Sequence, residues 1–229
     1  MSYQNFDDFV ASEANHVPLT PLSFLPRTAL MYPDRRAIVY GDRSYTWQSF
    51  FHRCQKLASA LNGAGVSKGD TVAVLAANTP EMIEAHFGVP MSGAVLNTIN
   101  TRLDDETIAY ILEHGEAKVF IVDYELAPQA KDALNILKDN DLLVIDILDY
   151  QNSTAPASMG RTDYESFLSS GSEEDQWHMP SDEWDAIGLS YTSGTSGRPK
   201  GVVYHHRGSY LMSMGTIADW DLPRHPNYL

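Results

Sequence analysis

Apolar residues along the chain follow two different periods. Several short runs rich in branched aliphatic residues have the length and composition of strands covered on both faces. Between these runs, apolar residues recur every three or four positions, which predicts helices. The strand-like runs lie at 71–76, 94–96, 119–122, 142–145 and 186–190. Because strand and helix alternate, we predict an α/β fold with a mostly parallel sheet and helices on both of its faces.

Capping residues mark where several of the helices should begin. Thr20 stands before a proline, Thr46 precedes a long apolar stripe, and Asp104 precedes a shorter one. Pro26 should kink or split the first helix. Further helices are expected at 79–87, 127–137 and 209–220. The runs on either side of Gly41-Asp-Arg predict a β-hairpin within residues 37–46.

The regular alternation is interrupted at residues 151–182. Serine, alanine, glycine and acidic residues dominate there, and one short helical pattern covers residues 164–168. We interpret this stretch as an acidic surface connection. It would separate an amino-terminal α/β subdomain with a hairpin, residues 1–150, from the start of a second, truncated α/β subdomain at 183–229.

Composition and charge narrow the range of partners. The chain has 229 residues, of which 43% are hydrophobic, enough for a sizeable core. Thirty acidic residues stand against 16 basic ones, which gives a net charge of −14. This balance argues against nucleic acid or an anionic membrane as a partner. No apolar run is long enough for an integral membrane segment.

The cysteine content and the first residues bear on the compartment. Cys54 is the single cysteine, and its spacing from Phe50 and Leu57 places it on an apolar helical stripe. We therefore predict a buried structural thiol. The sequence starts without the basic and apolar segments of a secretory signal. Together these features predict a cytoplasmic, reducing location.

A turn rich in glycine and hydroxyl residues separates the run 186–190 from the run 202–204. It reads Tyr-Thr-Ser-Gly-Thr-Ser-Gly-Arg-Pro-Lys-Gly over residues 191–201. Gly194 and Gly197 permit positive φ and a close approach of ligand to the backbone. Successive N–H groups in such a turn form an anion nest.

The side chains of this turn also suit phosphate. Hydroxyl donors and one compact positive charge are supplied by Ser193, Thr195, Ser196 and Lys200. The order differs from a Walker A motif, because Arg198 and Pro199 separate Gly197 from the lysine. We predict a phosphate-binding turn that does not belong to an ordinary P-loop NTPase. Arg198 itself could be simply solvated.

The ordered run Tyr-Thr-Ser-Gly-Thr-Ser-Gly-Arg-Pro-Lys-Gly-Val resembles the phosphate-loop motif of the adenylate-forming superfamily. This superfamily contains acyl-CoA synthetases, adenylation domains of peptide synthetases, and luciferases. Ser196 stands where the usual pattern has threonine and retains the hydroxyl. Tyr-His-His-Arg-Gly at 204–208 is similar to members acting on short- or medium-chain, thioether or aromatic acids. The run 88–102 also resembles these synthetases.

The resemblance implies an activity and a set of ligands. The activity is ATP-dependent conversion of a small-molecule carboxylic acid to its acyl adenylate, followed by transfer to coenzyme A, as in fatty acid metabolism. It implies that the ATP phosphates are bound by Thr192, Ser193, Gly194, Thr195, Ser196, Gly197 and Lys200, with Mg²⁺ at Thr192. The fold it implies is the amino-terminal part of the large domain of an acyl-CoA synthetase.

Family members continue well beyond a chain of this length. By resemblance, the acid pocket and the catalytic lysine belong to that further part, so we expect no catalytic residue here and no activity from this chain alone. Two other classes stay open. One is an adenylation domain that loads a carrier protein, and the other is a non-catalytic nucleotide-binding or dimerisation module. A homodimer also stays open.

Four polar residues outside the turn are weighed as site residues. Asn97 and Asn100 are expected to bond nearby backbone in a turn rather than a ligand. His205 and His206 are adjacent and have no zinc-type spacing to another ligand, so we expect no metal there. His205 is a weaker candidate for the border of the nucleotide or acyl pocket.

Overall fold

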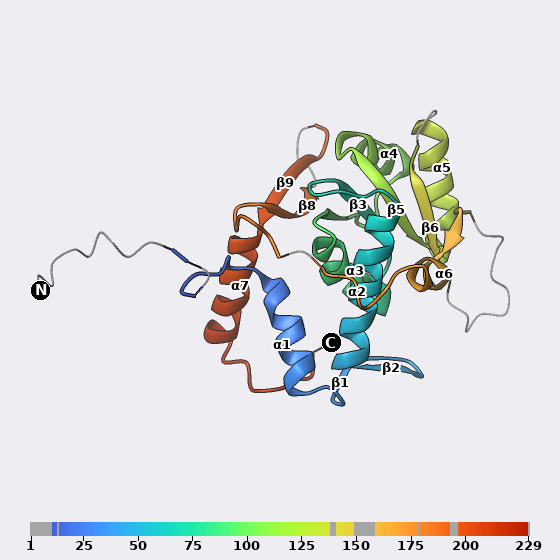
Figure 1. The fold of residues 1–229 in the computed structure, drawn as a ribbon. Helices are drawn as coiled ribbons and strands as arrows, with labels where there is room; N and C mark the ends of the chain where they lie inside the picture. The colour runs from blue at the N-terminus through green and yellow to red at the C-terminus, as the bar shows by residue number, and fades with distance from the viewer. Residues whose placement is uncertain are drawn as a thin grey trace, which may run out of the picture.

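A seven-stranded sheet forms the centre of the structure, a computed structural model that describes residues 11–12, 14–137, 141–148, 159–177, 179–192 and 197–228. Figure 1 shows helices on both sides of this sheet. The described helices are η2 (Pro21–Ser23), α1 (Phe24–Met31), α2 (Trp47–Gly63), α3 (Pro80–Met91), α4 (Asp105–His114), η3 (Tyr124–Leu126), α5 (Ala127–Leu137), α6 (Tyr164–Ser169) and α7 (His206–Asp219). The strands are β1 (Arg36–Tyr40), β2 (Arg43–Thr46), β3 (Thr71–Leu75), β4 (Val95–Thr98), β5 (Ala117–Asp123), β6 (Leu143–Ile147), β7 (Thr162–Asp163), β8 (Ala186–Thr192) and β9 (Lys200–His205).

The strand order in the sheet is β7-β6-β5-β3-β4-β8-β9. Every neighbouring pair is parallel except β8 and β9, which are antiparallel. The predicted α/β fold with a mostly parallel sheet is therefore confirmed. After β3 the chain crosses to β4 on one side, and after β4 it crosses back to β5 on the other side of β3. The winding direction thus reverses between β3 and β4.

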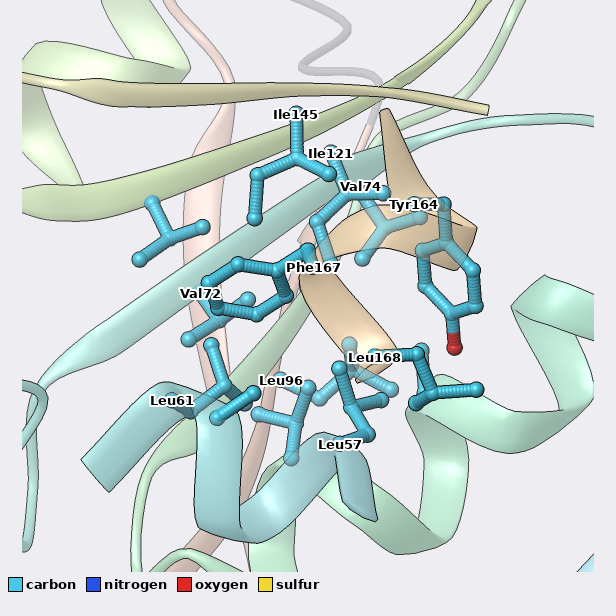
Figure 2. Close-up of a cluster of buried hydrophobic side chains, with 14 of the residues drawn as sticks. Leu57, Leu61, Val72, Val74, Leu96, Ile121, Ile145, Tyr164, Phe167 and Leu168 are labelled. Carbon is cyan, nitrogen blue, oxygen red and sulfur yellow. The ribbon is translucent and has the colours of Figure 1, made fainter. Parts of the chain in front are cut away.

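Both faces of the sheet are covered, as the apolar composition of its strands predicts. All five residues of β3 are buried. Even-numbered β3 residues such as Val72 and Val74 face α2, α3 and α6, where they contact Leu57, Leu61 and Phe167 (Figure 2). The alternate β3 residues pack on the opposite face against α4 and α5. The period of two along the strand places successive side chains in the two separate cores.

A third core joins the beginning of the chain to α2. It contains Leu22 and Leu25 from the first helical turns, Ile38 from β1, and Phe50 and Cys54 from α2. Cys54 is fully buried, which confirms the predicted structural thiol. The β1–β2 hairpin is also confirmed.

The predicted caps are present where the sequence places them. The hydroxyl of Thr20 accepts the N–H of Leu22, that of Thr46 accepts the N–H of Ser49, and the carboxylate of Asp104 accepts the N–H of Thr107. These bonds satisfy N–H groups that have no partner inside a helix. The first helical region is divided into η2 and α1 between Ser23 and Phe24, and Pro26 lies in the first turn of α1.

Two expectations about order and burial need correction. Part of the predicted acidic surface connection is built into the sheet and its core. Within it, β7 pairs with β6, and α6 buries Tyr164, Phe167 and Leu168 against α2 and the sheet. The division of the chain at 150 and 183 stays a prediction, although β8 joins the same sheet as β3 and β4. Strand β8, expected to be buried, is half-buried, and most of β9 is exposed.

Candidate functional site

The glycine-rich turn connects β8 to β9 at the edge of the sheet. From Gly188 the two strands are paired without a register shift up to Thr192, whose partner across the ladder is Lys200. The turn is therefore closed at its base by hydrogen-bonded strands, and both of these side chains are exposed there. Ser193, Gly194, Thr195 and Ser196 lie outside the described residues, so their roles in phosphate binding stay predictions.

Gly197 has the backbone geometry that the sequence predicts for this turn. Its φ is +146°, a value that disfavours any residue with a Cβ, and apart from its chain neighbours no atom of the described residues lies within 4 Å of where a Cβ would stand. The need for glycine here is thus conformational. The structure brings Thr192, Gly197 and Lys200 to one end of the hairpin. Among the described residues no ion pair involves Lys200.

This end of β8 lies at the carboxyl ends of the parallel strands, close to the point where the winding reverses between β3 and β4. Ligands of open α/β sheets bind at such points. A cavity of about 560 Å³ is found here, and we call it the polar cavity. Its lining includes Ala77, Asn78, Thr98, Asn100, Ser190 and Tyr191.

A second cavity of about 560 Å³ lies on the α3 side of β8, and we call it the apolar cavity. Its lining includes Pro21, Ile83, Phe87, Leu96, Ile187 and Tyr204. Three residues line both cavities, namely His86, Thr98 and Ser190. Nδ1 of His86 is 2.8 Å from the carbonyl oxygen of Met82, which makes it the donor of that bond. Its Nε2 is therefore the acceptor in the neutral ring.

The two asparagines differ from each other. Asn100 accepts the N–H of Arg102 at 3.0 Å, which confirms the predicted turn bond. The same expectation is wrong for Asn97, which is fully buried and has no partner for either amide atom within the described part of the chain. The reason is its place inside β4, where β3 and β8 take up the neighbouring backbone groups. Sequence reasoning weighed Asn97 but missed its burial, because burial of an asparagine inside a strand depends on the order of the strands in the sheet.

His205 and His206 each form a hydrogen bond within the fold. Nδ1 of His205 accepts the N–H of Gly208 and caps α7, and His205 lines neither cavity. His206 is buried, with Nδ1 2.8 Å from the hydroxyl of Thr20. Burial lowers the pKa of His206 to about 4, so its imidazole is neutral near pH 7.

Metal-binding groups are sparse in the part of the chain that the structure describes. No group of three or more histidine, cysteine or acidic side chains is arranged to hold a metal ion there. Towards Mg²⁺ the described turn offers the hydroxyl of Thr192. Protein-bound Mg²⁺ commonly takes a few protein oxygens together with substrate phosphates. One hydroxyl at the base of the predicted phosphate-binding turn fits this coordination pattern. The described helices also include none that is long and apolar enough to cross a bilayer.

Fold and turn together define an α/β protein with a turn rich in glycine and hydroxyl residues at the carboxyl ends of its parallel strands. The chain belongs to the AMP-binding enzyme family, which it matches over residues 25–229. It is 42% identical over 240 residues to an acetate/butyrate–CoA ligase, AAE7, from Arabidopsis thaliana, covering 99% of this chain and 42% of that protein. It is 43% identical over 236 residues to a trans-cinnamate:CoA ligase from Petunia hybrida, covering 97% of this chain and 41% of that protein.

The fold is shared with solved structures as well. The anthranilate CoA ligase AuaEII, determined in complex with anthranoyl-AMP, superposes with a TM-score of 0.75 at 24% identity, covering 86% of this chain and 37% of that one. The chain spans about two fifths of the length of the curated relatives named above.

The predicted cytoplasmic location is wrong. Both relatives named above are described as peroxisomal, as are two further ones. The prediction rested on the lack of a secretory signal and of disulfides. Neither feature distinguishes the cytoplasm from another compartment whose proteins carry free thiols.

Proposed function

We propose that this chain supplies the nucleotide-phosphate site of an AMP-forming acid–thiol ligase. The whole enzyme would activate a carboxylic acid with ATP and transfer the acyl group to coenzyme A. A carboxylate oxygen attacks the α-phosphorus of ATP and pyrophosphate leaves. The thiol of coenzyme A then displaces AMP from the acyl adenylate and loses its proton. The family membership of the chain and the CoA ligases among its relatives support this proposal.

The observation that carries the proposal is the geometry at the base of the turn. Lys200 stands opposite Thr192 across the β8–β9 ladder, and Gly197 between them has φ +146°. Negative charge grows on pyrophosphate as it leaves. Donors that are already fixed can stabilise this charge without reorganising. Lys200 would supply the positive charge, and the turn would supply N–H and hydroxyl groups. Mg²⁺ bound beside Thr192 would neutralise part of the phosphate charge.

The apolar cavity supports a small or aromatic acid as the substrate. Its lining is dominated by apolar side chains, among them Ile83 and Phe87 of α3. The hydrocarbon part of the acid would lie there. Its carboxylate would point towards His86, Thr98 and Ser190, which border the polar cavity on the side of the turn. This proposal revises the expectation that the chain contains no part of an acid pocket. The relatives that act on acetate, butyrate and trans-cinnamate fit this size range.

The test uses the complete gene product that contains this chain. It is incubated with ATP, Mg²⁺ and coenzyme A, and with acetate, butyrate, cinnamate or benzoate in turn, while AMP and acyl-CoA are measured. The proposal predicts that the two products form in equal amounts with at least one acid. ADP in place of AMP, or no product with any acid, contradicts it. Replacing coenzyme A by a carrier protein tests the alternative acceptor.

A further inference from the structure

Both ends of the glycine-rich turn contact the same helix, α4. Tyr191, the first residue of the turn, has its hydroxyl 2.8 Å from Nδ1 of His114. Arg198, near the end of the turn, has its guanidinium carbon 5.1 Å from the centre of the Tyr110 ring. Tyr110 and His114 are four residues apart in a helix and therefore share one face. One face of α4 thus contacts the turn on both sides.

The rings at this contact also pack on one another. The Tyr110 and His114 rings are 5.1 Å apart, and each meets the Tyr191 ring nearly edge-on, at 6.4 Å and 5.7 Å. Edge-to-face pairs at these distances are favourable beyond the area they bury. Arg198 extends this cluster through a cation–π contact with Tyr110. The sequence alone had left open that Arg198 is simply solvated.

Gly115 makes the approach of Tyr191 feasible. A Cβ at this position would lie 2.8 Å from the carbonyl oxygen of Ile111 and 3.3 Å from the Tyr191 hydroxyl. It would also lie 3.3 Å from Nδ2 of Asn97, the buried amide without a partner among the described residues. The glycine is therefore needed for close packing, since a larger residue would push the Tyr191 hydroxyl or the end of α4 away.

We propose that Tyr110, His114 and Gly115, which we call the α4 anchor, are positioning residues for the phosphate turn. They hold Tyr191 and Arg198, and so both sides of the turn, against the end of α4 before any nucleotide binds. This inference rests on the proposed function and deepens it. Ordering a free turn costs conformational entropy. If the two ends of the turn are already restrained, the turn loses less conformational entropy when phosphate binds, and binding is tighter.

Amide hydrogen exchange of the ligand-free 229-residue chain tests the anchor directly. Tyr110→Leu and Arg198→Leu should each speed exchange in peptides covering 188–201 by about two- to fivefold, the effect of losing one exposed cation–π contact. Tyr110→Phe retains the ring and should exchange like the wild type. Arg27→Leu removes an equal charge from an exposed position in α1 and is the matched control. The Tyr110→Leu/Arg198→Leu double variant should be no faster than either single variant, because the two residues act through one contact.

Titration with inorganic pyrophosphate separates the anchor from the proposed function. The two leucine variants should raise the dissociation constant by the same two- to fivefold, and Tyr110→Phe should restore it. If the wild type binds no pyrophosphate while the exchange pattern appears, the proposed function fails and the restraint of the turn by α4 stands. If exchange in 188–201 is the same in Tyr110→Leu, Arg198→Leu and the wild type, the anchor is overturned whatever the titration gives. Equal acceleration by Arg27→Leu overturns it as well.

Discussion

Replacing Arg53 by methionine should lower the free energy of unfolding by about 3–5 kcal/mol, the usual effect of removing one partner of a buried ion pair. Arg53 lies on α2 and is bonded to two carboxylates. Its Nε is 2.5 Å from one oxygen of Glu84 on α3, and its Nη2 is 2.6 Å from Glu165 on α6. The side chain of Glu84 is not exposed at all, and that of Glu165 is 44% exposed. The loss should therefore come mainly from Glu84.

The pKa values around Glu84 give this prediction its pH dependence. Burial raises the pKa of Glu84, and the hydrogen bond and charge of Arg53 oppose that rise. Burial also acts to lower the pKa of Arg53, but the bonds to Glu165 and Glu84 outweigh it, so the pKa is raised and the guanidinium stays charged. Without Arg53 nothing from that side chain counteracts the effect of burial, so the pKa of Glu84 rises further and its carboxyl takes up a proton at a higher pH.

The sign of the dependence follows from proton uptake. Between the unfolded pKa of 4.5 and the raised folded pKa of Glu84, the folded variant binds more protons than the unfolded chain. Its stability therefore increases as the pH falls through that window. The penalty of Arg53→Met should be largest near pH 8 and smaller near pH 5, because a protonated Glu84 carries no buried charge.

Urea unfolding followed by circular dichroism at both pH values measures these differences. Lys118→Met is the matched control, because it breaks a 2.7 Å pair with Asp70 in which the lysine is 55% exposed. Exposed pairs of this kind contribute about 1 kcal/mol or less. Glu84→Gln, which removes the buried charge and leaves Arg53 paired with Glu165, should cost about 1–3 kcal/mol. A loss below about 1 kcal/mol for Arg53→Met, or one that does not change with pH, would refute the reasoning.

Three further predictions concern other parts of the fold. Cys54 is fully buried, so a thiol reagent should label the native chain far more slowly than the chain in urea, and equal rates would contradict its burial. The pKa of His206 is lowered from 6.5 to about 4 by burial, so its contribution to stability is present above pH 6.5 and is lost as the pH falls towards 4. His206→Gln should accordingly show a shallower fall in urea midpoint between pH 7 and pH 5, and an unchanged slope would exclude a buried neutral imidazole. Gly115→Ala should cost about 1–3 kcal/mol through overpacking, whereas Gly63→Ala, where a Cβ would meet no atom of the described residues outside its own helix within 4 Å, should cost little. Equal urea midpoints for the two would argue against close packing at Gly115.

Features set by neighbours in the sequence could be predicted well. Thr46 and Asp104 cap their helices because the N–H groups they accept are three residues away. The strand β3 was recognisable because burial on both faces leaves a continuous apolar run. The composition of the turn likewise predicted that position 197 needs glycine, and the φ of +146° at Gly197 confirms it.

Features set by distant contacts could not be predicted. The helical pattern of α6 was predicted, but it was placed in a surface connection because its apolar side chains are few. In the structure its apolar side chains are buried, and Glu165 bonds Arg53 across 112 positions of the chain. The burial of Asn97 depends on β8 lying beside β4, a strand order that hydrophobic periodicity does not specify. The contact of Arg198 with Tyr110 is of the same kind.

The central claim, that the turn between β8 and β9 binds the phosphates of ATP, is tested most directly by acid-dependent ATP–pyrophosphate exchange. The complete gene product is compared with its Lys200→Met and Gly197→Val variants, and with Lys118→Met as a lysine control far from the turn. Lys200→Met should slow exchange by about tenfold to a thousandfold, the range for one electrostatic donor. Gly197→Val should be slower still, because a residue with a Cβ cannot readily adopt φ +146°. Exchange by folded Lys200→Met and Gly197→Val at the wild-type rate would contradict the claim.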